Sequence, residues 1–232
     1  GRNAEKLSAL REKLVALHPD LEILLIAADL SSDVGREATL IAAKSLPGGV
    51  NLLINNAGVS DFHAFASQPM DTVESLITTN LLSPILLCQK FLPLLQAQSN
   101  GQIVNIGSVF GDIGYPGFAA YCATKSGLRG FTQALRRELS DSRVRVRYFA
   151  PRATRTGINS SAVDQMNAAL KTQADEPKVV AQAFMDFLRS DRNERVLGWP
   201  EQLFVLINRL RYQITDNAIG KQLEVIKRYL PN

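Results

Sequence analysis

The stretch Gln102-Ile-Val-Asn-Ile-Gly-Ser108 is a short apolar run that stops at a polar turn, and a long helical pattern, Ala119–Ser140, follows it. This order of apolar run, turn and helical pattern recurs along the chain. We predict strands over Leu21–Ala28, Val50–Ile54, Gln102–Ile106, Val144–Phe149 and Arg195–Leu197, and helices over Ala4–Leu17, Asp33–Ser45, Asp71–Gln96, Ala119–Ser140 and Pro177–Arg189. Short apolar strands that alternate with helices are typical of βαβ units. The sequence therefore predicts an α/β fold, a doubly wound parallel sheet with helices on both faces.

Composition narrows the function classes. With 232 residues, 46% hydrophobic and 21% charged, the chain suits one domain with a sizeable core. The net charge of +4 comes without a basic block, which disfavours a nucleic-acid partner. Two histidines nearly exclude a His-based triad or a multi-His metal site, so we expect no metal. Two cysteines without a CxxC pair favour a reducing compartment, and we predict a cytoplasmic location.

No signal peptide or membrane span is evident in the sequence. The most apolar stretch, Leu81–Leu95, contains Gln89, Lys90 and two prolines, and we interpret it as part of a buried interface helix.

Polar residues follow four of the predicted strands. Asp29, Asn55, Ser108 and Pro151 each come directly after, or within two residues of, the end of a strand. In a doubly wound sheet, ligands bind beyond the carboxyl ends of the strands. We therefore expect these residues to lie at one edge of the sheet and to form a ligand site.

Tyr121 and Lys125 stand four residues apart in Tyr-Cys-Ala-Thr-Lys, and on a helix they share a face. An ammonium group beside a phenol stabilises the phenolate, so we expect the pKa of Tyr121 to fall from its usual value of about 10. Ser108 nearby could hold a substrate oxygen. The set indicates proton transfer at an alcohol or carbonyl, although an ordinary surface helix shows the same common spacing.

Two asparagine motifs add to the set. In Asn55-Asn56-Ala57-Gly58, small residues let the backbone approach a flat ligand and the amides can tie neighbouring strands together; an ordinary turn is the alternative. Asn80 lies in the middle of the predicted helix Asp71–Gln96, where it can open the helical hydrogen bonds for a water molecule or serve as an interface residue.

Taken in order, Asn55-Asn56-Ala57-Gly58, Asn80, Ser108 and Tyr121-x-x-x-Lys125 resemble the short-chain dehydrogenase/reductase family, over roughly residues 1–156. The resemblance implies a Rossmann-like domain that binds NAD or NADP. It also implies that Tyr121 is the general acid/base and that Lys125 lowers its pKa and binds the nicotinamide ribose. Ser108 would orient the substrate oxygen, and Asn80 would hold a water in the proton relay.

The same resemblance assigns cofactor contacts. Asp29, with Leu30, would meet the adenine, although an N-cap role for the following helix is the alternative for Asp29. Arg2 stands where an arginine accommodates the 2′-phosphate of NADP, and Gly1 before it is not an acid, which favours NADP(H) over NAD(H). The remaining expected cofactor contacts are Asn56, Ala57, Gly58, Tyr121, Lys125, Pro151, Thr154 and Thr156.

Two departures from the family pattern stand out. The first strand, its Gly-rich turn and the first helix, roughly thirty residues judged from the size of a βαβ unit, do not precede Arg2. A truncation, a disordered segment and a genuine fragment are the alternatives, and we favour a longer native protein in which this unit is disordered or omitted. Without the unit the pyrophosphate has no helix N-terminus, which motivates the rival hypothesis of a non-catalytic regulatory or interaction protein. Arg152 follows Pro151 where the family usually has glycine. It could narrow the site or contact a substrate acid, and an exposed loop arginine is the alternative we favour.

We expect one domain, with a cofactor-binding and catalytic core over 1–150, a substrate loop with the last helix and strand over 151–198, and a helical extension over 199–232. The polar segment Arg155–Ala174 would cover a small carbonyl or alcohol substrate. The apolar face of the extension could cap an apolar substrate channel, form an oligomer interface or rest on a membrane surface. Helices Asp71–Gln96 and Ala119–Ser140 resemble those that pair subunits in the family, so we expect a homodimer or homotetramer.

Overall fold

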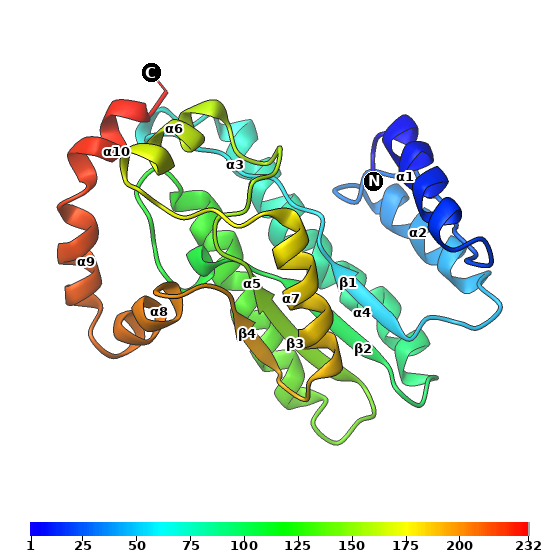
Figure 1. The fold of residues 1–232 in the computed structure, drawn as a ribbon. Coiled ribbons are helices and arrows are strands. Elements are labelled where there is room, and N and C mark those ends of the chain that lie inside the picture. Colours follow the sequence, from blue (N-terminus) through cyan, green and yellow to red (C-terminus); the bar gives the residue numbers. More distant parts are fainter. Residues whose placement is uncertain (232) are drawn as a thin grey trace.

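A four-stranded parallel sheet forms the centre of the computed structural model, which describes residues 1–231 (Figure 1). The strands follow one another in the sheet in chain order: β1 (Leu52–Asn55), β2 (Gln102–Ile106), β3 (Arg145–Ala150) and β4 (Glu194–Val196). Asn55 stands opposite Asn105, and Asn105 opposite Tyr148. Four of the five predicted strands are confirmed, with ends shifted by at most two residues.

Helices cover both faces of the sheet, as the sequence predicted (Figure 1). On one face α4 (Ser83–Gln96) and α5 (Ala119–Glu138) bury Ile103 and Val146 in a core that extends to α2 (Asp33–Lys44). On the other face Phe187 of α7 (Pro177–Arg189) packs on Val104 and Phe149. The strands alternate side chains between the two cores because successive residues of a strand point to opposite faces.

The predicted strand Leu21–Ala28 is wrong. This segment, which joins α1 (Ala4–Leu17) to α2, has no ladder with any sheet strand of residues 1–231. Its links include the bond from the Ala28 N–H to the Gly1 carbonyl, at 2.9 Å, and Leu21 and Leu24 are half exposed. An apolar run becomes a strand only when a neighbouring strand pairs its backbone. Figure 1 shows α1 and α2 at the β1 side of the sheet, with this segment outside it.

The predicted helix Asp71–Gln96 is one continuous helical stretch, Met70–Gln96, with a change of winding inside it. It consists of α3 (Met70–Ile77), a π-helical turn (Thr78–Leu82) and α4. By length and composition this stretch is apolar enough to cross a membrane. The buried core helix of a soluble protein can be equally long and apolar. Leu76, Leu87 and Leu95 of this stretch are each at most 5% exposed.

The segment after β3 and the C-terminal residues enclose one end of the sheet. Arg155–Ala174 contains α6 (Ser161–Ala169), whose Val163 and Met166 are buried. This segment, which we described as polar from its composition, therefore also contributes apolar side chains to the core. Beyond β4 the chain forms α8 (Glu201–Leu210), α9 (Tyr212–Gly220) and α10 (Leu223–Tyr229). Figure 1 shows these three helices running from the end of β4 up to α6.

Candidate active site

A cavity of about 670 Å³ opens at the carboxyl ends of the strands. The site residues predicted from sequence divide into two groups around it. The residues in its wall are Asn56, Gly58, Ser108, Tyr121, Lys125, Pro151, Thr154 and Thr156. The predicted residues outside the wall are Arg2, Asp29, Leu30, Ala57 and Asn80.

Ser108, Tyr121 and Lys125 come together from two neighbouring elements. Ser108 follows β2 and its Oγ accepts a hydrogen bond of 3.1 Å from the Phe110 N–H, which begins the short turn Val109–Gly111. Tyr121 and Lys125 lie in the first two turns of α5. The Lys125 Nζ donates to the Ile106 carbonyl at 3.1 Å and stands 5.8 Å from the centroid of the Tyr121 ring. One β-strand end and one helix therefore hold all three groups.

The expected fall in the pKa of Tyr121 is not what the structure shows. Burial raises the pKa of Tyr121 above its usual value, and a hydrogen bond with the Ser108 hydroxyl offsets the rise only in part. Desolvation disfavours a charged phenolate, while the Lys125 ammonium is bonded to a backbone carbonyl. The phenol consequently keeps its proton at neutral pH.

Burial also changes Lys125, which is 6% exposed. Removing an ammonium group from water lowers its pKa, here from 10.5 to about 8.

We expect the ¹³Cε resonance of Lys125, assigned with Lys125→Arg, to titrate with a midpoint near pH 8 in an NMR experiment. Lys90 is the internal control, because its hydrogen bond to Glu37 raises its pKa. A Lys125 midpoint as high as that of Lys90 would contradict the burial seen here.

Asn80 occupies the π-helical turn and is completely buried. Its Oδ1 accepts from the Val59 N–H at 2.8 Å, and its Nδ2 donates to the Val59 carbonyl at 2.8 Å. A π-helical turn shifts the backbone hydrogen bonds by one residue and is frequent at functional sites. The side chain of Asn80 thus clamps the backbone that follows β1. Its predicted role as the ligand of a relay water stays a prediction.

The amides after β1 tie neighbouring strands together, as expected, whereas the approach of a flat ligand to this turn stays a prediction. Across the sheet, the Asn55 Nδ2 donates to the Asn105 Oδ1 at 2.8 Å, and the Asn105 Nδ2 donates to the Thr132 hydroxyl of α5 at 2.8 Å. This chain of buried amides ties β1 to β2 and β2 to the helix of Tyr121. A Cβ atom at Gly58 would stand 3.2 Å from the Asn80 Oδ1 and 3.8 Å from the Lys125 Nζ. Glycine therefore leaves this strip of backbone bare.

The residues expected at the adenosine end lie together but away from the cavity. The Asp29 carboxylate accepts the Ser31 N–H at 3.0 Å and the Ser31 hydroxyl at 2.8 Å, and these bonds, with the charge of Arg2, lower the pKa of Asp29. Ser32, not Asp29, is the N-cap of α2. The Leu30 carbonyl accepts from the Ser83 hydroxyl at 2.7 Å.

Arg152 is not the exposed loop arginine that we favoured. Its side chain is 13% exposed and pairs with Asp175, at 2.7 Å, and with Glu201 of α8, at 3.2 Å. Its hydrogen bonds to the two carboxylates raise the pKa of the guanidinium. No motif pointed to these partners, which lie 23 and 49 residues away in the sequence.

An apolar wall, which sequence reasoning also missed, packs beside the predicted catalytic residue Tyr121. Phe110 and Tyr115 stack with ring centroids 4.9 Å apart, and Phe118, Val163 and Met166 complete this part of the lining. The C-terminal residues support it from behind, because Ile226 of α10 is fully buried in the same cluster and Gln222 accepts from the Tyr115 hydroxyl at 3.2 Å. Only their apolar character could have pointed to these residues.

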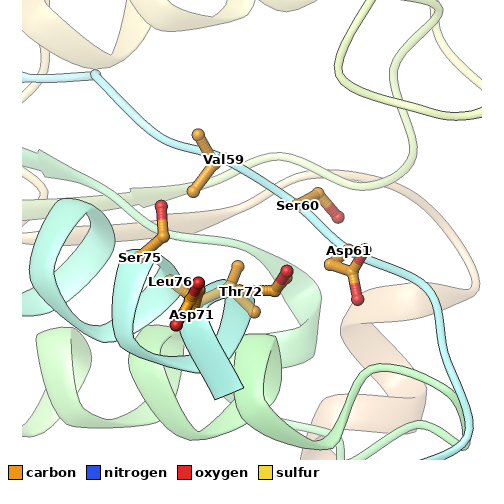
Figure 2. A pocket seen from close by; sticks show the side chains of 7 residues that line it. All are labelled: Val59, Ser60, Asp61, Asp71, Thr72, Ser75 and Leu76. Atoms are coloured by element: carbon orange, nitrogen blue, oxygen red, sulfur yellow. The ribbon is translucent and has the colours of Figure 1, made fainter. Parts of the chain in front are cut away.

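A second hollow of about 200 Å³ lies between the backbone of residues 59–61 and α3 (Figure 2). Figure 2 shows Ser60 and Asp61 on this backbone, facing Asp71, Thr72 and Ser75 of α3. Asp61 is already bonded to His63 and to Gln68. Within residues 1–231 no group of three or more metal-binding side chains occurs.

The cavity wall fits the nicotinamide end of a dinucleotide cofactor. The Lys125 ammonium donates to a single carbonyl in the structure and retains donors suited to ribose hydroxyls. The bare strip at Gly58 would admit a flat group. Asn56, Gly58, Tyr121, Lys125, Pro151, Thr154 and Thr156 are the residues that would hold this end.

Known proteins are similar to this chain in sequence and in fold. A family model described as short chain dehydrogenase matches residues 1–167. Carbonyl reductase family member 4 of Xenopus laevis is 32% identical over 169 residues, which cover 72% of each chain. A 2,3-dihydroxy-2,3-dihydro-p-cumate dehydrogenase of Pseudomonas putida is 37% identical over 152 residues, 66% of this chain and 58% of the relative. A metagenomic short-chain oxidoreductase in complex with NADP has a TM-score of 0.63 and 31% identity, covering 85% of this chain and 82% of its own.

This chain belongs to the short-chain dehydrogenase/reductase family. The relatives it matches are dehydrogenases and reductases, enzymes of carbonyl and hydroxyl groups.

Proposed function

We propose that the protein is an NADP(H)-dependent oxidoreductase that interconverts a small, uncharged carbonyl compound and its alcohol, with Tyr121 as the general acid/base. The observation that carries the proposal is the meeting of Ser108, Tyr121 and Lys125 in one cavity, beside an aromatic wall. The core over 1–150 would supply cofactor binding and catalysis, and residues 151–198 with the extension 199–232 would supply the substrate side.

The nicotinamide cofactor, when bound, supplies the hydride for reduction and accepts it in oxidation. The chain's own groups handle the oxygen and its proton. Ser108 donates a hydrogen bond to the carbonyl oxygen and fixes its position. Tyr121 gives its phenolic proton to this oxygen as the hydride reaches the carbon, so that carbonyl, hydride and proton make one alcohol. Lys125 binds the ribose and stabilises the phenolate that remains.

The preference for NADP(H) rests on Arg2. It lies close enough to Asp29 to lower the pKa of that carboxyl group, so its charge sits beside the residue expected at the adenine. We expect the native protein to bind NADPH about tenfold more tightly than NADH, roughly the effect of one charged contact to a phosphate. Arg2→Ala should remove most of the difference, and Arg11→Ala, an exposed arginine of α1, should not.

The cofactor titration also separates the proposal from its rival. Isothermal titration with NADPH and NADH, followed by a reduction assay with a neutral aryl ketone, gives binding and turnover on the same sample. Binding with turnover supports the enzyme. A native protein that binds neither cofactor would be the non-catalytic regulatory or interaction protein instead.

Assembly and location form part of the proposal. Along the stretch Met70–Gln96, Met70, Ile77 and Leu82 are 74%, 45% and 44% exposed, which supports a homodimer or homotetramer paired through this stretch and α5. Leu203, Phe204, Leu206 and Leu210 of α8 are exposed, which supports either an oligomer contact or a peripheral membrane contact. Light scattering with and without lipid vesicles distinguishes the two. Free, buried thiols at Cys88 and Cys122 support a reducing compartment such as the cytoplasm.

A further inference from the structure

We infer that Arg152, Asp175 and Glu201 form a charge gate that makes the site select uncharged, apolar carbonyl substrates and reject anionic ones such as keto acids. The inference rests on the proposed function and names its substrate class. The term charge gate refers below to these three residues.

The charge gate stands next to the catalytic serine. The Pro151 carbonyl accepts a hydrogen bond of 3.2 Å from the Val109 N–H, so the residue after Pro151 lies beside the turn that begins at Ser108. Arg152 and Glu201 both line the cavity that holds Tyr121. A substrate in this cavity meets the gate at close range.

Arg152 is the one cavity cation besides Lys125 among the described residues, and both of its faces are occupied. Its Nη2 and Nε donate to the two Asp175 oxygens at 2.7 and 3.0 Å, a bidentate pair. Its Nη1 donates to Glu201 at 3.2 Å. Asp175 therefore occupies the bidentate Nε–Nη2 edge and Glu201 occupies Nη1, so a substrate carboxylate that approaches the guanidinium also meets two carboxylates.

The charges of the gate add up to one negative charge, from one guanidinium and two carboxylates. The three side chains are only 13%, 16% and 21% exposed, so water screens this charge weakly. Gly198 makes the packing feasible. It has a φ of +98°, and a Cβ there would stand 2.6 Å from the Arg152 Cδ. The backbone is thus shaped to bring α8 and its Glu201 against Arg152.

The apolar part of the cavity wall offers an anion no charged partner. Phe110, Tyr115, Phe118, Val163 and Met166 present rings, methyl groups and a thioether. An anion that enters loses its hydration without gaining a partner, whereas an apolar body gains contact. The wall and the gate therefore favour the same class of substrate.

The test compares methyl 4-acetylbenzoate with 4-acetylbenzoate, a neutral ketone and an anion of nearly the same shape. The wild-type protein with NADPH should show a kcat/KM at least about 100-fold higher for the ester. In Glu201→Gln the gate loses one negative charge and one fork of Arg152 is loosened, so this ratio should shrink about tenfold. Glu224→Gln makes the same change at an exposed site of α10 and should leave the ratio unaltered.

Two further variants guard the interpretation. Asp175→Asn should narrow the ester-to-acid ratio of kcat/KM as Glu201→Gln does. It replaces Glu201→Gln in the test if that variant has a lowered melting temperature. Arg152→Gln should leave the acid as poor a substrate as before. A wild-type preference for the acid that Arg152→Gln abolishes would show Arg152 binding the substrate and overturn the gate. Equal kcat/KM for ester and acid in the wild type would also overturn it. Turnover of neither compound would refute the proposed function, and the gate with it.

Discussion

Tyr121→Phe should lower kcat for ketone reduction by about 10³-fold while leaving the melting temperature and the Kd for NADPH close to those of the wild type. The substitution removes one hydroxyl, the hydrogen-bond partner of Ser108 and the proposed proton donor, and keeps the ring that packs against Phe110 and Phe118. Proton transfer then has no donor. Steady-state kinetics and thermal unfolding measured on the same preparation give the result.

The raised pKa of Tyr121 sets the pH dependence of this step. Reduction needs the protonated phenol, so the rate should be full below the pKa and should fall as the pH passes it. Because burial moves this pKa upward, the rate of reduction should remain flat through neutral pH. Oxidation needs the phenolate, so its rate should still be rising at the upper end of the pH range.

Tyr212→Phe is the matched control. Tyr212 is 59% exposed at the start of α9, and the loss of its hydroxyl should change neither kcat nor KM. If Tyr121→Phe kept most of the wild-type kcat, Tyr121 would not be the acid, and the mechanism would have to be abandoned.

The strand predictions are correct for those apolar segments that have neighbouring strands to pair with. The runs Gln102–Ile106 and Val144–Phe149 became β2 and β3 because each pairs on both sides and is buried on both faces. Leu21–Ala28 is also rich in apolar residues but has no ladder neighbour in residues 1–231. The apolar character of a segment can be read from its own sequence, whereas strand formation also requires a second segment that pairs with its backbone.

The candidate site shows the same division. Tyr121 and Lys125 could be paired from their spacing, because a helix fixes which side chains share a face. The direction of the Tyr121 pKa could not be predicted, since it depends on burial by residues distant in sequence. Asp175 and Glu201 have no motif at all. Asp175 reaches Arg152 because its backbone pairs with Ala153 and Arg155, and Glu201 reaches it because the chain turns after β4 at Gly198.

Gly107→Ala should lower both stability and activity. A Cβ at Gly107 would stand 2.0 Å from the Tyr148 ring, which is fully buried and cannot retreat. The backbone cannot easily move the other way, because the Gly107 N–H donates to the Phe149 carbonyl at 2.7 Å. Overpacking of this kind typically costs about 1–3 kcal/mol. Any relief shifts Ser108, the next residue, and a shift of about 1 Å at a positioning group lowers kcat by about 10²-fold.

Gly114→Ala separates this clash from a general effect of glycine replacement. Gly114 lies in the loop between Ser108 and α5, and a Cβ there would meet nothing within 4 Å. Its alanine variant should unfold at the wild-type urea concentration and keep the wild-type kcat. A Gly107→Ala protein as stable and as active as Gly114→Ala would mean that Tyr148 does not support the Ser108 turn. A Gly107→Ala protein that retains most of its stability but loses kcat would place the strain at Ser108 itself, since the core would then have absorbed the methyl group only by moving the catalytic hydroxyl.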